Sequence, residues 1–429
     1  MDNKGDSTIT TYDREPGVEM SSSVPTEYRG TTADARDMKV LGKTQVLRVF
    51  AGWLSAIGWQ VYLAGVCFMV GGLIQALISL NNESYVPERW HQTLLTIAVV
   101  STSVVFNTVL AVKLPLIEVL VVVIPLWAMA PSKPVNTALF DYTHVGGWDT
   151  KGLAALVGMV TPLNVLIGYD CTVHMAEELY DASITLPKVI MWSVAPNACL
   201  GLLVILTLAF CSGNLEEVLQ TRTGEPFVQI FYNATGSKAA SSVMVAIVII
   251  LLVSCCFSEV ATASRQLWSF ARDKGLPASS WLEQVQPGWN IPLRAVVVSF
   301  VVVLLLSLIN IGSTTALRSI SSLGAVAILG SYLVTIGTLI WRRLYGAPLP
   351  TRRWSLGRYG LAINIIAVCF VLPLFVFAFF PLTKEVDRET LNYASVMFIG
   401  VLCIALVYYV FRGRNLYVGP VALIEKNRS

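Results

Sequence analysis

Long apolar stretches that carry no Asp, Glu, Lys or Arg recur along this chain from about residue 49 onward. A helix that crosses a bilayer needs about 20 predominantly apolar residues, and helices of soluble proteins are rarely apolar on every face. Ten such stretches follow one another, at residues 49–82, 90–112, 119–132, 152–169, 189–215, 239–258, 295–317, 319–341, 359–383 and 390–411. We therefore predict an all-α polytopic membrane protein with about ten transmembrane helices in contact with the lipid bilayer.

Composition agrees with helices and argues against a membrane barrel. Hydrophobic residues make up 55% of the chain, charged residues make up 13%, and the mean hydropathy is +0.65. Barrel strands alternate apolar and polar residues over short segments, whereas the run at 296–306 does not alternate. Helices satisfy their own backbone hydrogen bonds in lipid, so they are the expected spanning elements.

The distribution of basic residues predicts the orientation. Most of the 30 Lys and Arg residues fall in segments that are cytoplasmic if the N-terminus is cytoplasmic, as the positive-inside rule requires. Two glycosylation sequons, at Asn82 and Asn233, fall in segments that this topology places outside. We expect cytoplasmic termini, glycosylation at both asparagines and a plasma-membrane location, with the vacuole left open.

Polarity divides the chain into three regions. Residues 1–45 are polar, with Ser and Thr runs, and predict a disordered cytoplasmic arm without a signal peptide. Residues 46–412 form the expected transmembrane domain, and residues 413–429 a cytoplasmic tail. The eight cysteines lie within or beside apolar stretches, which is typical of packing residues. The three histidines lack metal-site spacing, so we predict no metal and no cofactor.

The fourth stretch, 152–169, is irregular at its end. A helix that ends near Gly168 and restarts about four residues later would be a broken span, which transporters tolerate where the backbone lines a substrate cavity. Alternatively, the span simply ends at Tyr169, and Asp170 caps a following cytoplasmic helix. The spacing of residues leaves both interpretations open.

A second unusual segment follows the sixth stretch, at 264–277. Its apolar and aromatic residues interleave with basic residues, a pattern typical of an interfacial helix on the cytoplasmic leaflet. Gly275 and Pro277 are expected to end that helix.

Four segments carry a family resemblance: GWLSAIGWQ at 52–60, GYDCTVHMAEE at 168–178, SEVATASRQLWSFARDKGLP at 258–277 and NIPLR at 290–294. Together they resemble the fungal amino acid/choline permeases of the amino acid–polyamine–organocation superfamily, over about residues 45–415. The sequence FARDKGLP is the most specific mark, and EVLQ followed by YNAT leans toward the choline and 4-aminobutyrate branch.

The resemblance implies a leucine-transporter-like fold, in which five helices and an inverted repeat of five are followed by two more. In that family the substrate sits between the broken first and sixth helices, and protons generally drive uptake. The segment 52–80 would correspond to the third helix of the family, so we expect a fold that lacks the first two helices. The resemblance also favours the broken span at 168–171.

Residues at the proposed break are the first candidates for substrate binding, namely Gly168, Tyr169, Asp170 and Cys171. Charges deep in a membrane are costly and invite a functional interpretation. Asp170 would bind a cationic amine, couple protons, or only cap a half-helix. Tyr169 would either stack on a quaternary ammonium group or pack.

Other candidates come from neighbouring stretches. The resemblance places Trp59 and Gln60 where the third helix of the family lines the cavity, although Gln60 would also suit a bond to a neighbouring helix. For gating or proton coupling we single out Glu118, Glu259 and Arg265. A cytoplasmic salt bridge between Glu259 and Arg265 is one hypothesis, and an ordinary interfacial pair is the other.

Two functions remain open from the sequence. The first is a secondary active transporter, driven by protons, for a small amine such as an amino acid, choline or 4-aminobutyrate. The second is a truncated, non-transporting relative with a sensor or regulatory role, which the expected lack of two helices favours. An enzyme is not expected because no His, Asp or Ser constellation converges. No nucleotide-binding loop suggests an ATP-driven pump, and nothing suggests nucleic-acid binding.

Overall fold

The structure is a computed structural model, and it describes residues 45–109, 116–140, 146–176, 179, 181–286, 291–346, 349, 353–387 and 391–417. Within helices, the side chains of 107–109, 116–122, 216 and 314–319 are outside the description. The predicted arm, apart from Gln45, and residues 418–429 of the predicted tail lie outside the described residues. The three-region division therefore stays a prediction.

Across these ranges the regular elements are all helical. The longer helices are α2 (Gln45–Asn81), α3 (Arg89–Val109), α4 (Leu116–Met129), α9 (Ala182–Cys211), α11 (Pro226–Thr235), α12 (Lys238–Arg272), α14 (Leu293–Gly312), α15 (Thr314–Tyr345), α16 (Gly360–Phe377) and α17 (Ala394–Tyr408). The shorter ones are α5 (Val135–Phe140), α6 (Lys151–Gly158), α7 (Val160–Leu166), α8 (Cys171–His174), α10 (Leu215–Leu219), α13 (Ser279–Leu282), η2 (Gly357–Tyr359), η3 (Tyr409–Gly413) and α18 (Arg414–Leu416).

The prediction of an all-α polytopic membrane protein is confirmed. Seven helices in the described part of the chain are long and apolar enough to cross a membrane. Each of the ten predicted stretches contains a helix, although α4 and the α6–α7 segment are shorter than a full span. The five-plus-five arrangement implied by the resemblance stays a prediction.

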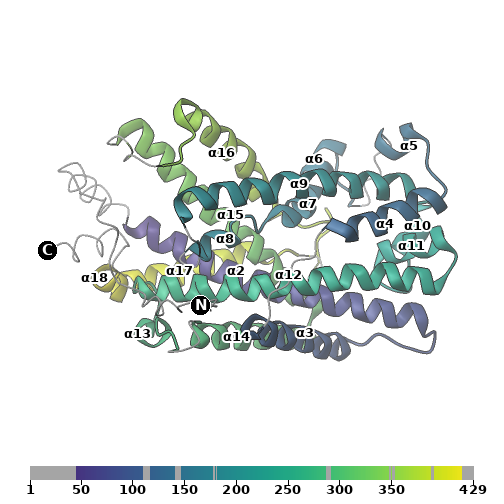
Figure 1. Cartoon of the computed structure of the whole chain (residues 1–429), viewed down its shortest axis with the longest axis horizontal. Coiled ribbons are helices and arrows are strands. Elements are labelled where there is room, and N and C mark those ends of the chain that lie inside the picture. Colours follow the sequence, from purple (N-terminus) through teal and green to yellow (C-terminus); the bar gives the residue numbers. More distant parts are fainter. Residues whose placement is uncertain are drawn as a thin grey trace, which may run out of the picture.

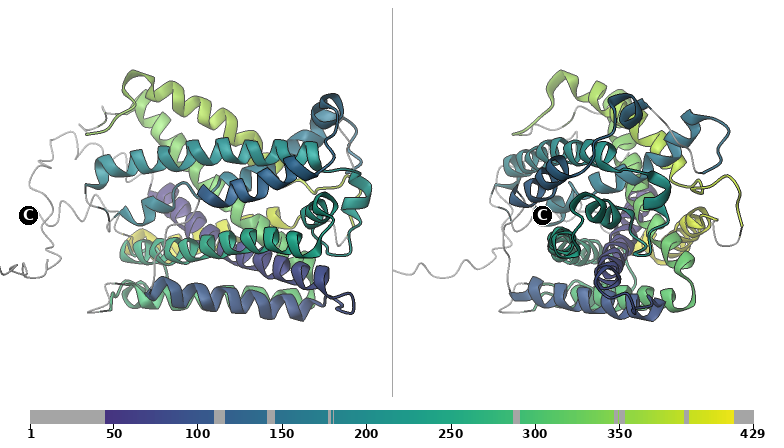
Figure 2. Two further views of the ribbon diagram at one scale, coloured as in Figure 1. Left: turned by 45° about the vertical axis from the view of Figure 1, so that its right-hand side comes forward. Right: turned by 90° about the vertical axis from the view of Figure 1, so that its right-hand side faces the viewer.

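Helix α2 forms the centre of the bundle. It packs against α3, α12, α14, α15 and α17. In the most apolar part of α2, 61% of the residues are buried inside the bundle. The corresponding share for α9 is 11%, so α9 is peripheral. Figure 1 shows the long helices running along the longest axis, with α9 and α4 above and α3 and α14 below, and Figure 2 shows the same bundle from two further sides.

Small residues allow the backbones of α2 and α15 to approach closely. A Cβ atom at Gly324 would lie 3.0 Å from the backbone nitrogen of Tyr62, and one at Gly58 would lie 2.8 Å from Ile328 Cγ1. Membrane helices commonly use small residues for such contacts, because packing rather than the hydrophobic effect drives their association. This contact holds Tyr62 at a fixed position beside α15.

The prediction of a separate interfacial helix at 264–277 is wrong. Helix α12 continues without interruption to Arg272, so most of this segment is the end of a transmembrane helix. The physical reason is burial: Leu267, Phe270 and Ala271 belong to a buried cluster with residues of α2 and α17 instead of facing the membrane interface. The chain then turns at Lys274, whose φ is +60°.

Two ion pairs anchor the segment that runs from α6 to the start of α9. Asp149, just before α6, pairs with Lys384, and we call this contact the first tie. Asp181, just before α9, pairs with Arg353 at 2.6 Å, and we call this contact the second tie. Both ties reach loops that flank α16.

Asn82 and Asn233 are exposed and lie at the same end of the bundle. Glu83 pairs with Lys238 Nζ at 2.7 Å, which joins the loop after α2 to the beginning of α12, directly after α11. The two sequons are thus on one side, as the predicted topology requires. Glycosylation itself stays a prediction.

Candidate functional site

The fourth apolar stretch is interrupted where the sequence suggested a break. Helix α7 ends at Leu166, residues 167–170 leave helical geometry, and the single turn of α8 begins at Cys171. Ile167 is extended, with φ −67° and ψ 140°, and Gly168 has φ +118°, a conformation that residues with a Cβ rarely adopt. The glycine therefore allows the chain to leave one helix and start another.

The Asp170 side chain faces α15 and does not cap α8. No capping hydrogen bond from the α8 backbone reaches its side chain. Instead Tyr332 Oη donates to Asp170 Oδ1 at 2.7 Å, and His174 Nε2 lies 3.6 Å from Asp170 Oδ2. The side chain is 16% exposed, so the carboxylate is nearly enclosed. Asp170 therefore does not cap a following helix, whereas α8 comprises only four residues, so a broken span with a second helical half stays a prediction.

Tyr332 is a member of this cluster that the sequence did not reveal. Its ring lies 5.4 Å from that of Tyr169, centroid to centroid, at an interplanar angle of 35°. Together with the hydroxyl bond to Asp170, this places two aromatic rings and one carboxylate next to the break. Such a combination can hold a cation through charge and ring quadrupole at once.

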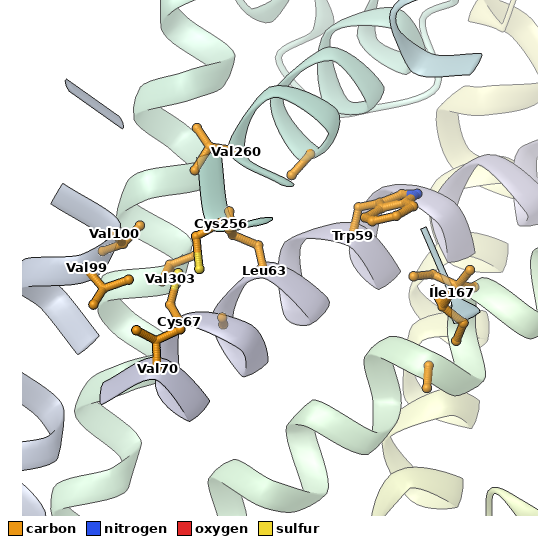
Figure 3. Close-up of a cluster of buried hydrophobic side chains, with 14 of the residues drawn as sticks. Trp59, Leu63, Cys67, Val70, Val99, Val100, Ile167, Cys256, Val260 and Val303 are labelled. Atoms are coloured by element: carbon orange, nitrogen blue, oxygen red, sulfur yellow. The ribbon is translucent and has the colours of Figure 1, made fainter. Parts of the chain in front are cut away.

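Helix α2 contributes two aromatic residues to the same region. The Trp59 ring is 1% exposed and lies 5.8 Å from the ring of His174, edge to face. Tyr62 Oη donates to the backbone carbonyl of Asn164 at 2.5 Å, within α7. In Figure 3 the Trp59 ring lies beside Ile167, away from the sulfur atoms of the same buried cluster. The structure thus brings Trp59 close to the break, and its role in substrate binding stays a prediction.

Several buried polar atoms around the break have no hydrogen-bond partner among the described residues. They are Trp59 Nε1, Asn164 Oδ1, Thr172 Oγ1 and His174 Nε2. Buried polar groups are nearly always paired in folded proteins. Their grouping at one place indicates a site for a polar ligand or for water.

Gln60 faces away from the break. Its Nε2 donates to the Ala263 carbonyl at 3.1 Å and to Ser299 Oγ at 2.9 Å, on α12 and α14. Successive residues of a helix point about 100° apart, so Trp59 and Gln60 serve different neighbours. The structure therefore favours the alternative that Gln60 forms hydrogen bonds to neighbouring helices. Cys171 begins α8 and packs against the buried cluster that contains Trp59.

Glu259 and Arg265 both lie on the continuous helix α12, and no ion pair joins them. The Glu259 carboxylate is 4% exposed, and its Oε1 accepts a hydrogen bond from Cys255 Sγ at 3.5 Å. Arg265 donates to the Ala261 carbonyl at 3.4 Å. Residues six apart on a helix are about 120° apart around its axis, which explains why the two side chains diverge. A gating role for either residue stays a prediction.

Glu118 belongs to α4, but its side chain lies outside the described residues. No group of three or more His, Cys, Asp or Glu side chains able to hold a metal ion occurs in the described part of the chain. The candidate site therefore consists of the break, the Asp170–Tyr332 pair, and the aromatic residues of α2.

Comparison with known proteins agrees with this architecture. The family model described as amino acid permease matches residues 39–403. An uncharacterized amino-acid permease of Schizosaccharomyces pombe is 28% identical over 94% of this chain and 76% of its own length. A choline transporter of Saccharomyces cerevisiae is 26% identical over 82% of this chain and 64% of its own length. Amino-acid permease 2 of Neurospora crassa is 26% identical over 86% and 70%, respectively.

Proposed function

Because the chain belongs to the amino acid permease family, we propose that it is a proton-coupled secondary transporter of a small amine at the plasma membrane. The substrate would be an amino acid, choline or 4-aminobutyrate. The observation that carries this proposal is the interrupted helix at 167–170, where Asp170 meets the aromatic rings of Tyr169 and Tyr332.

The chemistry of these groups suits an ammonium head group. A carboxylate held by a tyrosine hydroxyl provides a fixed negative charge, and two nearby rings attract a cation through their faces. Residues 167–170 make no continuous helix, and turn hydrogen bonds occupy Ile167 N, Gly168 O and Asp170 O, so a guest molecule would use the other peptide groups of this segment. The relatives named as a choline transporter and as amino-acid permeases support the same class of substrate.

The test is uptake of labelled choline, 4-aminobutyrate and amino acids in yeast cells that lack their own carriers. Asp170→Asn keeps the acceptor oxygen for Tyr332 but removes the charge. A charge-assisted hydrogen bond contributes about 1.5–3 kcal/mol, which corresponds to roughly 10- to 150-fold weaker substrate binding. Surface expression of the variant should match that of the wild type.

A matched control is Asp149→Asn, since that carboxylate is 70% exposed in the first tie and lies before α6, at the end of the α6–α7 segment that is away from the break. Uptake by this control should stay close to wild type. Normal uptake by Asp170→Asn would remove the carboxylate from the site. A wild-type protein that reaches the surface but carries none of the substrates would instead support the non-transporting, regulatory alternative.

A further inference from the structure

Glu259 is a second enclosed carboxylate close to the break, and its surroundings differ from those of Asp170. It lies on α12 about 32 Å along the helix from Lys238 and about 20 Å from Arg272, at 1.5 Å per residue. We infer that Glu259 carries the coupled proton, whereas Asp170 holds the substrate. This inference rests on the proposed function.

The hydrogen bonds of Glu259 do not stabilise a charge. Its Oε1 accepts from the Cys255 thiol at 3.5 Å, and thiols are weak donors. Its Oε2 is buried and has no partner among the described residues. An ionised carboxylate in such a place would be desolvated without compensation. A neutral carboxyl with a proton on Oε2 removes most of that cost.

The titratable groups that face Glu259 are all neutral in their usual state. They are Cys255 and Cys256 from α12 itself, Tyr62 from α2 and Cys171 from the start of α8, each close enough to interact electrostatically with the carboxylate. None of these four supplies a positive charge. The proton is therefore the cation that best fits the site.

Asp170 has the opposite surroundings. Its Oδ1 accepts from the Tyr332 hydroxyl at 2.7 Å, and the imidazole of His174 lies 3.6 Å from Oδ2. Two carboxyl groups in one site take different roles when one has donors and the other has an apolar environment. We therefore assign binding of the ammonium group to Asp170 and binding of the proton to Glu259.

Electrostatic interactions link Glu259 to residues beside the break. Tyr62, which faces Glu259, donates to the Asn164 carbonyl just before the break. Cys171, directly after the break, interacts with Thr262, which lies one helical turn beyond Glu259. A change in charge at Glu259 therefore changes the electrostatic potential at residues on both sides of 167–170. In each cycle one proton would bind Oε2 from the outer solution and leave to the cytoplasm with one substrate.

The experiment uses the full chain, purified and reconstituted in liposomes, with the substrate identified by the uptake assay. Exchange of labelled for unlabelled substrate needs no net proton movement, whereas accumulation against a gradient does. For Glu259→Gln we expect exchange within about twofold of wild type. Accumulation driven by an inward proton gradient should fall at least tenfold, and its pH dependence should disappear. The control Glu217→Gln, an exposed acid on α10, should retain both activities.

The outcomes separate the inference from the proposed function. Proton-driven accumulation by Glu259→Gln, or loss of its exchange activity, would overturn the inference. If that variant does not fold, Glu259→Asp provides the test, since a carrier of the proton should shift the pH midpoint of accumulation. An unchanged midpoint would overturn the inference. Wild-type protein that exchanges substrate without any proton dependence would instead refute proton coupling, and wild-type protein without exchange would refute transport.

Discussion

Replacing Gly324 by alanine tests whether the close contact between α15 and α2 is required. The added Cβ would lie 3.0 Å from the backbone nitrogen of Tyr62 and 3.2 Å from its Cα. These atoms belong to the backbone of the central helix, so no side-chain rotation can relieve the contact. The two helices must separate by a few tenths of an ångström.

The magnitude follows from two opposing effects. Alanine favours a helix over glycine by about 1 kcal/mol, while overpacking a well-packed contact costs about 1–3 kcal/mol. Gly337 lies on the same helix, and nothing is within 4 Å of a Cβ placed there. Gly337→Ala therefore gains only the contribution of about 1 kcal/mol from the higher helix propensity of alanine. The difference in free energy of unfolding between the two variants isolates the contact, and we expect about 1–3 kcal/mol.

Stability is measured by denaturant titration of the purified variants in mixed micelles, and uptake is measured in parallel. Uptake by Gly324→Ala should also fall, because Tyr62 donates to the Asn164 carbonyl beside the break. Equal stability of the Gly324 and Gly337 variants would refute the packing argument. Reduced stability with unchanged uptake would separate the α2–α15 contact from the site.

Two further predictions concern residues outside the break. Gln60→Leu removes two hydrogen bonds to α12 and α14, so it should lower the free energy of unfolding by about 1–3 kcal/mol. The KM for the substrate should stay unchanged. A raised KM would show that Gln60 belongs to the substrate site. Asn233→Gln should abolish a mobility shift caused by a glycan on that asparagine. A wild-type protein that carries no glycan on Asn233 or Asn82 would leave the predicted sidedness without this support, and a glycan on a residue predicted to be cytoplasmic would contradict it.

The helical spans were predictable because a long apolar stretch without charged residues is the feature that a helix needs to cross the lipid bilayer. The break was predictable in position, since Gly168 supplies a conformation that other residues avoid. Its partner Tyr332 was not, because it lies 162 residues further along the chain and its contact depends on how α15 packs against the bundle.

Two expectations failed for different physical reasons. The segment 264–277 has the composition of an interfacial helix, yet its apolar residues are buried by α2 and α17. Glu259 and Arg265 have opposite charges, yet the phase of an unbroken helix separates them. Tertiary packing, which local sequence does not contain, decided the first outcome, and the six-residue spacing within one continuous helix decided the second.

The predicted topology would place the two ties, before α6 and before α9, in contact with different aqueous compartments. Each is a partly exposed ion pair, with side-chain exposures of 70% and 48% for Asp149 and Lys384, and 32% and 62% for Asp181 and Arg353. Exposed pairs contribute about 0–1 kcal/mol and weaken with ionic strength. Under the predicted topology the ties lie on opposite sides of the membrane, so added electrolyte in one compartment would screen only the nearer pair. The ionic strength of each compartment would then bias its own end of the segment independently.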